Sequence, residues 1–290
     1  MSDALPRVVR TIADVRSQVQ VWRDAGLTVG LVPTMGALHH GHLSLVDTIG
    51  QKVDRVIVSI FVNPTQFGEG EDFDVYPRDE DADLAKLLGR PCHLVYAPSP
   101  SEMYPQGFVT SVRVIGISDD LEGTERPGHF NGVATVVAKL LHQTRPHKAI
   151  FGEKDYQQLV VIRQFVRDLD IPVDIMGGAL IREDDGLAAS SRNAYLTASG
   201  RQIASKLYKT LQAVRDDIKD GKPVRQAEAK GRTALISEGF TDVDYITLRD
   251  AATLKEVDDP AGTSPMRLLA VARIKDVRLL DNIPVEDIPL

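Results

Sequence analysis

The sequence predicts an α/β fold, in which a parallel sheet with helices on both faces is followed by a smaller α+β domain. Up to residue 181, short apolar runs alternate with helical patterns, and the runs are rich in β-branched residues. Nearly continuous apolar runs are typical of strands buried on both faces, and strands that alternate with helices indicate a parallel sheet. After residue 181 the pattern changes, so we expect two domains, residues 1–181 and residues 182–290, within the 290-residue chain.

The first domain is expected to contain five buried strands, at residues 28–33, 55–62, 93–97, 148–151 and 173–181. A helix is expected to begin near Leu43. In residues 131–144 and again in residues 156–169, apolar side chains recur at the i, i+3, i+4 and i+7 spacing of an amphipathic helix. Parallel sheets bind ligands beyond the carboxyl ends of their strands, so the loops that follow the strands are candidate sites.

The second domain is expected to begin with a charged loop over residues 182–191. Two helices, about residues 200–219 and 224–238, then lead to three strands, which are expected to be antiparallel. The strands are predicted at residues 243–248, 268–274 and 277–280. We expect the tail, residues 282–290 with two prolines, to be loosely held.

Composition excludes several classes of protein. Hydrophobic residues make up 43% and charged residues 26% of the chain, as in an ordinary globular protein, and the net charge of −7 predicts no nucleic-acid surface. A single cysteine, Cys92, excludes an internal disulfide and fits a reducing cytoplasm. No stretch approaches the roughly 18 apolar residues of a membrane span, and residues 1–6 lack a signal-peptide pattern.

Residues 35–42, Met-Gly-Ala-Leu-His-His-Gly-His, follow the first expected strand and precede a helix. The N-terminus of a helix offers unpaired N–H groups and a partial positive charge, which together bind phosphate. His39 and His42 add donors, and Gly41 lets a nucleotide approach the backbone. Taken alone, the motif is equally well a strand–helix turn with solvated histidines.

Residues 61–68, Phe-Val-Asn-Pro-Thr-Gln-Phe-Gly, end the second strand. The amide of Gln66 is able to read both the hydroxyl and the carboxylate of a small acid, although a simple polar turn explains the motif as well. The acidic loop that follows, residues 69–83, is either a mobile flap or an ordinary solvated loop.

Three further segments carry groups suited to phosphate or substrate. Lys154 is a natural counter-charge for phosphate, Asp155 can accept from a ribose hydroxyl, and Gln158 lies one helical turn after the lysine. Residues 190–193, Ser-Ser-Arg-Asn, are able to clamp pyrophosphate or to serve as a polar linker. Residues 126–133 form a tight helix start that Asn131 is expected to cap, and His129 has either a structural or a substrate-side role.

Taken together and in order, these motifs resemble the pantothenate synthetase (pantoate–β-alanine ligase) family. The resemblance covers residues 29–200 closely, and the two-part layout fits throughout. The matching motifs are Pro33-Thr-Met-Gly-Ala-Leu-His-x-Gly-His42, Phe61-Val-Asn-Pro-Thr-Gln-Phe-Gly68, Tyr76-Pro-Arg78, Arg126-Pro-Gly-His-Phe-x-Gly-Val133, Gly152-Glu-Lys-Asp155 and Asp185-Gly-Leu-Ala-x-Ser-Ser-Arg-Asn193.

The resemblance implies a Rossmann-like nucleotide-binding domain of the His-x-Gly-His nucleotidyltransferase superfamily, with the C-terminal domain as a lid over the cleft. It implies that pantoate is bound by Gln66 and Gln158, that β-alanine lies near Gln66, and that His42 is the proton donor. The catalytic groups would be His39, His42, Lys154 and Arg192. The implied ATP-binding residues are Met35, Gly36, Ala37, Leu38, His39, His40, Gly41, His42, Gly152, Glu153, Lys154, Asp155, Ile181, Ala189, Ser190, Ser191 and Arg192.

The resemblance also implies a cytoplasmic homodimer that joins D-pantoate to β-alanine and splits ATP to AMP and pyrophosphate with Mg²⁺. The pantoate carboxylate would first attack the α-phosphorus, and the amine of β-alanine would then attack the pantoyl adenylate. The sequence suggests no metal-binding cluster, so Mg²⁺ is expected to ride on the phosphates, with Asp83 as a water-mediated contact.

Two rival functions stay open at this point. A different adenylate-forming or nucleotidyl-transferring enzyme would share the ATP motifs but not the use made of Gln66 and Gln158. A non-catalytic nucleotide-binding module would bind ATP without releasing pyrophosphate. A tRNA synthetase is disfavoured, because the chain has no anticodon-binding domain and a net negative charge.

Overall fold

The computed structural model describes residues 5–261 and 265–285, which form two compact units. The first unit comprises the described residues up to Glu153 together with Gln157–Ala179. The second comprises Lys154–Tyr156 and the described residues from Leu180 onward.

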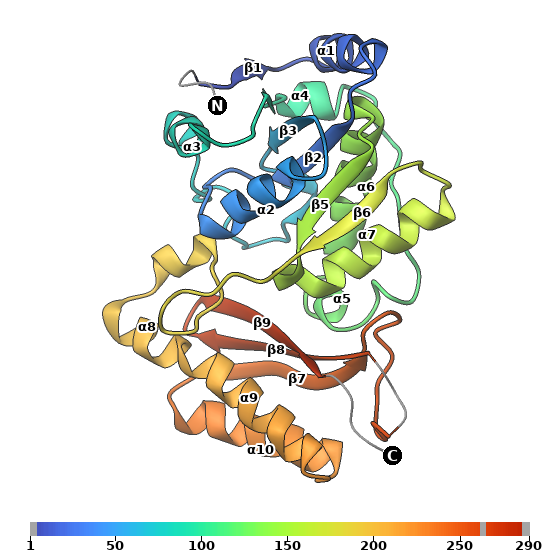
Figure 1. Cartoon of the computed structure of the whole chain (residues 1–290). Coiled ribbons are helices and arrows are strands. Elements are labelled where there is room, and N and C mark those ends of the chain that lie inside the picture. The colour runs from blue at the N-terminus through green and yellow to red at the C-terminus, as the bar shows by residue number, and fades with distance from the viewer. Residues whose placement is uncertain (1–4, 262–264, 286–290) are drawn as a thin grey trace. The chain divides into compact units, whose positions relative to one another are not determined.

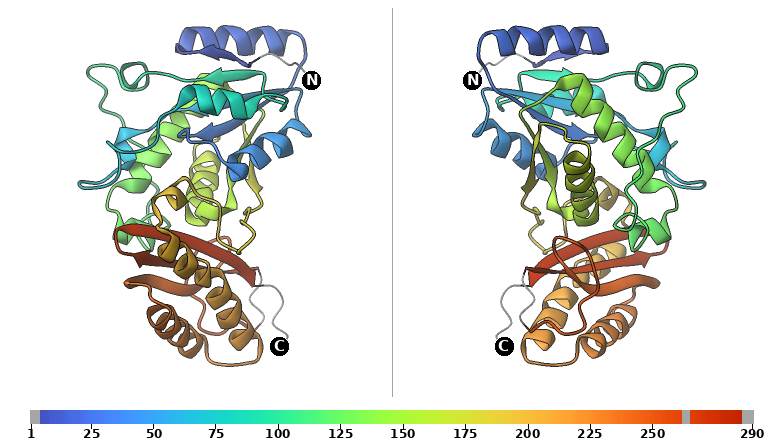
Figure 2. Two further views of the ribbon diagram at one scale, coloured as in Figure 1. Left: turned by 90° about the vertical axis from the view of Figure 1, so that its left-hand side faces the viewer. Right: turned by 90° about the vertical axis from the view of Figure 1, so that its right-hand side faces the viewer.

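The first unit is built on a parallel sheet of six strands in the order β1-β4-β3-β2-β5-β6. Helices cover both faces of this sheet (Figures 1 and 2). The strands are β1 Arg7–Val9, β2 Val29–Thr34, β3 Arg55–Ile60, β4 Leu94–Tyr96, β5 Lys148–Gly152 and β6 Asp174–Gly178. The helices are α1 Ile12–Asp24, α2 His40–Gly50, α3 Glu80–Leu87, α4 Pro100–Met103, α5 Glu122–Glu125, α6 His129–Thr144 and α7 Tyr156–Asp168, with the short 3-10 helices η1 Pro64–Gln66 and η2 Glu153–Asp155.

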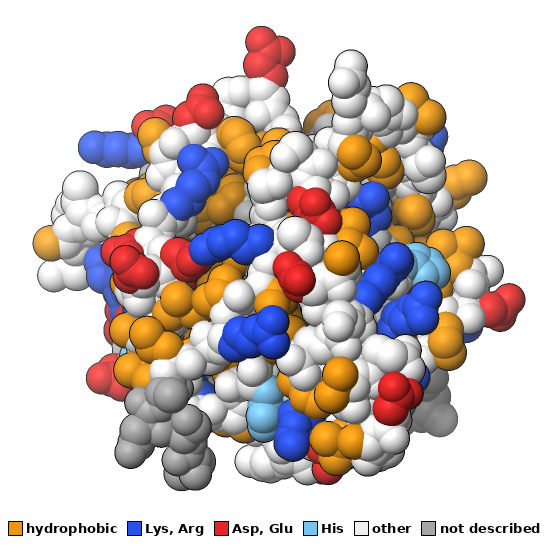
Figure 3. Space-filling model, turned by 90° about the horizontal axis from the view of Figure 1, so that it is seen from above, with side chains coloured by type: hydrophobic (Ala, Val, Ile, Leu, Met, Phe, Trp, Pro, Cys, Tyr) orange, Lys and Arg blue, Asp and Glu red, His pale blue; other side chains and the backbone are white. Residues whose placement is uncertain are grey.

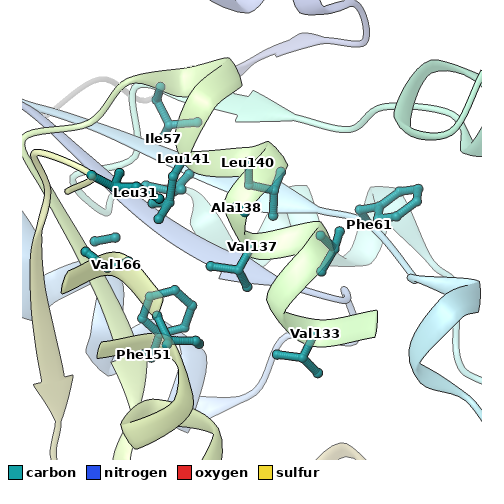
Figure 4. Packing of buried hydrophobic residues seen from close by; sticks show 14 of the residues in the cluster. Leu31, Ile57, Phe61, Val133, Val137, Ala138, Leu140, Leu141, Phe151 and Val166 are labelled. Carbon is teal, nitrogen blue, oxygen red and sulfur yellow. The ribbon is translucent and has the colours of Figure 1, made fainter. Parts of the chain in front are cut away.

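The two faces of this sheet have separate hydrophobic cores because neighbouring side chains of a strand point to opposite faces. Leu31 and Ile57 pack with α1, α6 and α7 on one face, and Figure 4 shows part of this cluster around α6. Val32 and Val58 pack with α2 and α3 on the other face. Burial on both faces explains why the strands are continuous apolar runs.

The second unit is an antiparallel sheet of three strands in the order β7-β8-β9, packed against two helices. Its elements are η3 Ser191–Tyr195, α8 Ala198–Ala204, α9 Lys206–Lys219, α10 Val224–Ser237, β7 Asp242–Asp250, β8 Met266–Ile274 and β9 Val277–Val285. Apolar residues of these helices and strands form one core. The predicted fold class, a parallel α/β sheet with a smaller α+β part, is confirmed.

Several local predictions are wrong. The helix expected over residues 200–219 is two helices, α8 and α9, separated at Ser205. The last residues of the supposed loop 69–83 already belong to α3, which Asp79 caps by accepting from the Ala82 N–H. Residues 282–285 are not loose but pair with β8 as part of β9, while residues 286–290 lie outside the described part. The sequence analysis did not identify β1 and α1.

Acidic and basic side chains are interspersed on the face shown in Figure 3, with hydrophobic ones between them. Among the described residues, no helix is both long enough and apolar enough to cross a membrane.

Candidate active site

The loop after β2 is fixed by hydrogen bonds from two other parts of the first unit. The Thr34 hydroxyl donates to the Ser59 carbonyl on β3 (2.8 Å) and accepts from the Gly36 N–H (3.2 Å). Gly36 has φ +81°, the left-handed region that favours glycine, and Ala37 follows at φ +49°. The Leu38 N–H donates to Oδ1 of Asp83 at 2.7 Å. These bonds hold a strained turn that leads directly into α2.

Asp83 holds the backbone of the loop after β2 from its place in α3. Its side chain is 2% exposed and lies in α3, where it accepts from the Leu38 N–H and pairs with Lys86 at 3.5 Å. It lies in a helix rather than on a flap, and its water-mediated contact with Mg²⁺ stays a prediction. No local pattern indicates this contact, because 45 residues separate Asp83 from Leu38.

His39 and His42 lie side by side at the N-terminus of α2. His39 is the N-cap, and its Nδ1 accepts from the Gly41 N–H at 3.1 Å. In neutral His39 the proton is therefore on Nε2, which makes Nε2 a donor. The two imidazole ring centres are 4.1 Å apart. The Gly41 N–H was expected to be unpaired and available to phosphate. It instead donates to His39, so the Nε2–H of His39 is the donor offered at this position.

The amide of Gln66 is oriented by its neighbours. Asn63 Nδ2 donates to Gln66 Oε1 (3.0 Å), and Gln66 Nε2 lies 3.3 Å from the Met35 sulfur. Asn63 is itself 1% exposed and accepts from the Tyr104 hydroxyl at 2.7 Å. Because Asn63 donates to Oε1, the amide of Gln66 has one defined orientation. Asn63 and Tyr104 thus orient the Gln66 amide, a contact that the motif alone did not indicate.

The backbone of Gln66 is held by the residues that precede α6. His129 Nδ1 lies 2.8 Å from the Gln66 carbonyl, and Arg126 Nη2 donates to the same oxygen at 3.3 Å. Arg126 also forms two hydrogen bonds to Glu71, of 2.7 and 2.6 Å. Gln66, Glu71, Arg126 and His129 all line a cavity of about 280 Å³, which is room for a small molecule.

Charge and burial determine the protonation states of His129 and Glu71. Burial and then the neighbouring Arg126 charge lower the pKa of His129 to about 4. His129 is thus neutral near neutral pH, with its proton on Nδ1 because a carbonyl only accepts. Burial acts to raise the pKa of Glu71, but the hydrogen bonds and charge of Arg126 outweigh it and hold that pKa below its ordinary value. His129 therefore has a structural contact with Gln66, and because it also lines the cavity, a substrate-side role stays a prediction.

The start of α6 differs from the prediction. Its N-cap is Gly128, at φ +84°, and Asn131 lies inside the first turn, so Asn131 is not the cap. Gly132 matters for a different reason. A Cβ at this position would lie 2.3 Å from the Thr65 carbonyl oxygen, and Asn63 donates to the Gly132 carbonyl at 3.2 Å. Only glycine allows α6 to approach the Gln66 segment this closely.

Lys154 lies in η2 and belongs to the second unit, whereas Gln158 lies in α7 and belongs to the first. Because η2 runs directly into α7, Gln158 still follows Lys154 by about one helical turn, and their facing one cleft stays a prediction. Lys154 Nζ lies 3.5 Å from Asp155 Oδ1, and its carbonyl accepts from Asn282 Nδ2 at 2.9 Å. Gln158 is half-buried, and no hydrogen bond of its side chain is seen within the described chain.

Residues 181–189 form a hairpin rather than an open loop. Arg182 pairs with Ala188 in an antiparallel bridge, and the Ala189 N–H donates to the Ile181 carbonyl at 2.9 Å. The hairpin therefore brings together Ile181 and Ala189, two of the predicted ATP-binding residues. Ser190 then caps η3 by accepting from the Arg192 N–H at 3.3 Å.

An ion pair anchors this hairpin to β9. Arg182 forms two hydrogen bonds to Asp281, of 2.7 and 2.8 Å, and its guanidinium lies 3.6 Å from the centre of the Tyr208 ring. The Asp281 side chain is 1% exposed. Burial raises the pKa of the Asp281 carboxyl, and the charge and hydrogen bonds of Arg182 oppose that rise.

The predicted ATP-binding residues are thus divided between the units. Residues 35–42, Gly152 and Glu153 belong to the first, and Lys154, Asp155, Ile181 and residues 189–192 to the second. Within the first unit the structure brings Met35 together with Gln66, and His39 with His42.

A parallel sheet whose β2 runs into a helix that begins with two imidazoles defines an α/β protein with an anion-binding helix start. The family model for pantoate–β-alanine ligase matches residues 7–284, and the chain belongs to that family of amide-bond-forming ligases. The family resemblance found in the sequence is confirmed.

Relatives match over almost the whole chain. The pantothenate synthetase of Rhodospirillum rubrum is 55% identical, covering 97% of this chain and 99% of the relative. That of Paramagnetospirillum magneticum is 54% identical over 99% of this chain and all of the relative.

Two solved structures are similar. Pantothenate synthetase from Thermus thermophilus has a TM-score of 0.89 at 44% identity, covering 97% of this chain and all of that chain. Pantoate–β-alanine ligase from Francisella tularensis, in complex with β-γ ATP and β-alanine, has a TM-score of 0.82 at 34% identity, covering 97% and 98%.

Proposed function

We propose that this protein condenses D-pantoate with β-alanine at the expense of ATP, giving pantothenate, AMP and pyrophosphate through pantoyl adenylate. Membership of the pantoate–β-alanine ligase family supports this reaction, and the related Francisella structure is a complex with β-γ ATP and β-alanine. The observation that carries the proposal is the pair of imidazoles at the start of α2, with Nε2 of neutral His39 as a donor.

In the first half-reaction, a carboxylate oxygen of pantoate attacks the α-phosphorus of ATP. A P–O bond to pantoate forms, the P–O bond to the β-phosphate breaks, and pyrophosphate leaves with the electron pair. Negative charge develops on the bridging oxygen, so preorganised donors lower the barrier. We assign this role to His39, His42, Lys154, Ser190, Ser191 and Arg192.

In the second half-reaction, the amine of β-alanine attacks the acyl carbon of pantoyl adenylate. An amide bond forms, the acyl–phosphate bond breaks, and AMP leaves, while the amine loses a proton. Gln66 and Gln158 are assigned to pantoate, and Gln66 also lies near β-alanine. Orienting the reactants is expected to supply roughly 7–11 kcal/mol of the barrier, so no covalent enzyme intermediate is needed.

Several finer assignments are part of the same proposal. Mg²⁺ enters with ATP, bound to the phosphate oxygens that it prefers as ligands. The enzyme acts in the cytoplasm as a homodimer, and residues 182–290 act as a lid over the bound substrates.

The proposed function is tested by measuring AMP formation from ATP with pantoate and β-alanine each omitted in turn. We expect full turnover only with both, and no turnover without pantoate. AMP formation that ignores pantoate but follows another carboxylic acid would contradict the substrate assignment. ATP binding without any pyrophosphate release would support the non-catalytic alternative.

Gln66→Ala and Gln158→Ala are expected to raise the Michaelis constant for pantoate far more than that for ATP. Removing either amide leaves polar groups of pantoate without a partner, which a polar site tolerates poorly. Separate determination of the two Michaelis constants decides the matter. Gln164→Ala is a matched control, because Gln164 is half-buried on α7 and, within the described residues, its side chain bonds to its helix neighbours Asp168 and Arg167. A rise confined to the Michaelis constant for ATP would contradict the assignment of these amides to pantoate.

A further inference from the structure

The segment Lys154–Tyr156 is short, yet it belongs to a different unit from the residues on both sides of it. The chain up to Glu153 and the chain from Gln157 both belong to the first unit. The three residues between them belong to the second unit, with β7, β8 and β9. The position of Lys154 is therefore tied to the C-terminal sheet.

One side chain of β9 makes the direct contact with Lys154. Asn282, 3% exposed, donates from Nδ2 to the Lys154 carbonyl at 2.9 Å. Its Oδ1 accepts from Arg267 Nε, on the neighbouring strand β8, at 2.6 Å. Because a guanidinium only donates, Arg267 requires the oxygen of the Asn282 amide to face it. The amide nitrogen is thereby aimed at the Lys154 carbonyl.

The other end of the segment is fixed by the same arginine. The guanidinium of Arg267 lies 4.3 Å from the centre of the Tyr156 ring, within the range of a cation–π contact. The Tyr156 hydroxyl donates to the Ala251 carbonyl at 3.0 Å. The backbone that carries Lys154 is thus held at its carbonyl by Asn282 and two residues later by Arg267 and Ala251.

We propose that Asn282, oriented by Arg267, is a positioning residue that aims Lys154 at the phosphates of ATP. This inference rests on the proposed function, in which Lys154 binds those phosphates. Neither Asn282 nor Arg267 is assigned to a substrate, so their effect passes through the lysine. Displacement of a group by about 1 Å can lower a rate on the order of 10²-fold, so a hydrogen bond to the lysine backbone matters for catalysis.

The main test is Asn282→Asp in the full-length enzyme. Aspartate keeps the acceptor for Arg267 but has no N–H for the Lys154 carbonyl. We expect kcat/KM for ATP to fall roughly 10- to 100-fold, while KM for pantoate is unchanged. Arg267→Lys, which keeps the charge but loses the planar guanidinium, is expected to produce the same selective loss and serves if Asn282→Asp does not fold.

Asp244→Asn is the matched control for damage to the sheet. Asp244 is a buried carboxylate on β7 that bonds Arg273 on β8 and Arg278 on β9. Arg273 pairs with Arg278 four residues along from the pairing of Leu269 with Asn282, a separation of about 13 Å. The control is expected to lower the melting temperature without lowering kcat/KM for ATP.

A double-mutant cycle of Asn282→Asp with Lys154→Ala distinguishes a positioning role of Asn282 from a general structural role. If Asn282 acts through Lys154, Asn282→Asp causes no further loss in the Lys154→Ala background. Equal losses in both backgrounds, a loss no larger than that of Asp244→Asn, or a parallel rise in KM for pantoate would each overturn the inference. Failure of the proposed function is a separate result, since the unmodified enzyme would then form no AMP in response to pantoate.

Discussion

Lys154→Ala and His42→Ala are each expected to lower pantoate-dependent AMP formation by about 10²–10³-fold, or about 3–4 kcal/mol. Both side chains are assigned to oxygens whose charge grows as pyrophosphate leaves, so each loss is expected mainly in kcat. Neither residue is part of a hydrophobic core. Lys154 lies in the short helix η2, and His42 lies in the first turn of α2.

The controls are a lysine and a histidine outside the proposed site. Lys148 on β5 forms a surface ion pair with Asp174, and His142 is exposed on α6. Lys148→Ala and His142→Ala are expected to leave turnover nearly unchanged, because exposed ion pairs contribute little. Melting temperatures close to that of the unmodified enzyme would show that the catalytic variants are folded. Turnover near that of the unmodified enzyme in either catalytic variant would contradict the assignment.

Arg182→Ala is expected to produce the largest loss of stability, about 3–5 kcal/mol in the free energy of unfolding. The variant would leave the carboxylate of Asp281, 1% exposed, without its charged partner, and it would remove the guanidinium from the Tyr208 ring. Urea unfolding measures the loss. Arg182→Ala combined with Asp281→Asn is expected to be more stable than Arg182→Ala alone, because no buried charge then lacks its partner.

The loss of stability in Arg182→Ala should also depend on pH, and it should become smaller as the pH is lowered. Burial already raises the pKa of Asp281, and without Arg182 the pKa should rise further. Between the pKa of Asp281 in the folded unmodified enzyme and this further raised value, the folded variant holds a proton that both the unfolded chain and the folded unmodified enzyme have released. Lowering the pH through that window therefore stabilises the variant relative to the unmodified enzyme. A difference in stability that is larger in acid than at neutral pH would contradict the role of the buried charge.

Much of the fold followed from periodicity. The apolar spacing at 3.6 residues predicted α6 and α7, and the continuous run that became β3 indicated a strand buried on both faces. Local spacing did not distinguish α8 from α9, because the apolar stripe continues across Ser205, where one helix ends and the next begins. The same helical spacing occurs in α1, where Val15, Val19 and Trp22 are four and three residues apart and are buried.

The residues that carry charge or a reactive group could be predicted from the motifs, but their supports could not. Asp83 holds the Leu38 N–H, and Asn282 holds the Lys154 carbonyl, across 45 and 128 residues of sequence. Such contacts depend on how strands and helices pack, which no local spacing encodes. Motifs also failed to show that Gly132 is required for close approach rather than for a turn.

In the proposed mechanism, pantoate is activated as an adenylate before β-alanine reacts. Exchange of labelled pyrophosphate into ATP, with enzyme, Mg²⁺ and pantoate but without β-alanine, tests it most directly. We expect exchange that requires pantoate and falls sharply in Lys154→Ala and Arg192→Ala. Exchange that strictly required β-alanine would contradict the adenylate intermediate and favour a concerted reaction or a phosphorylated acid.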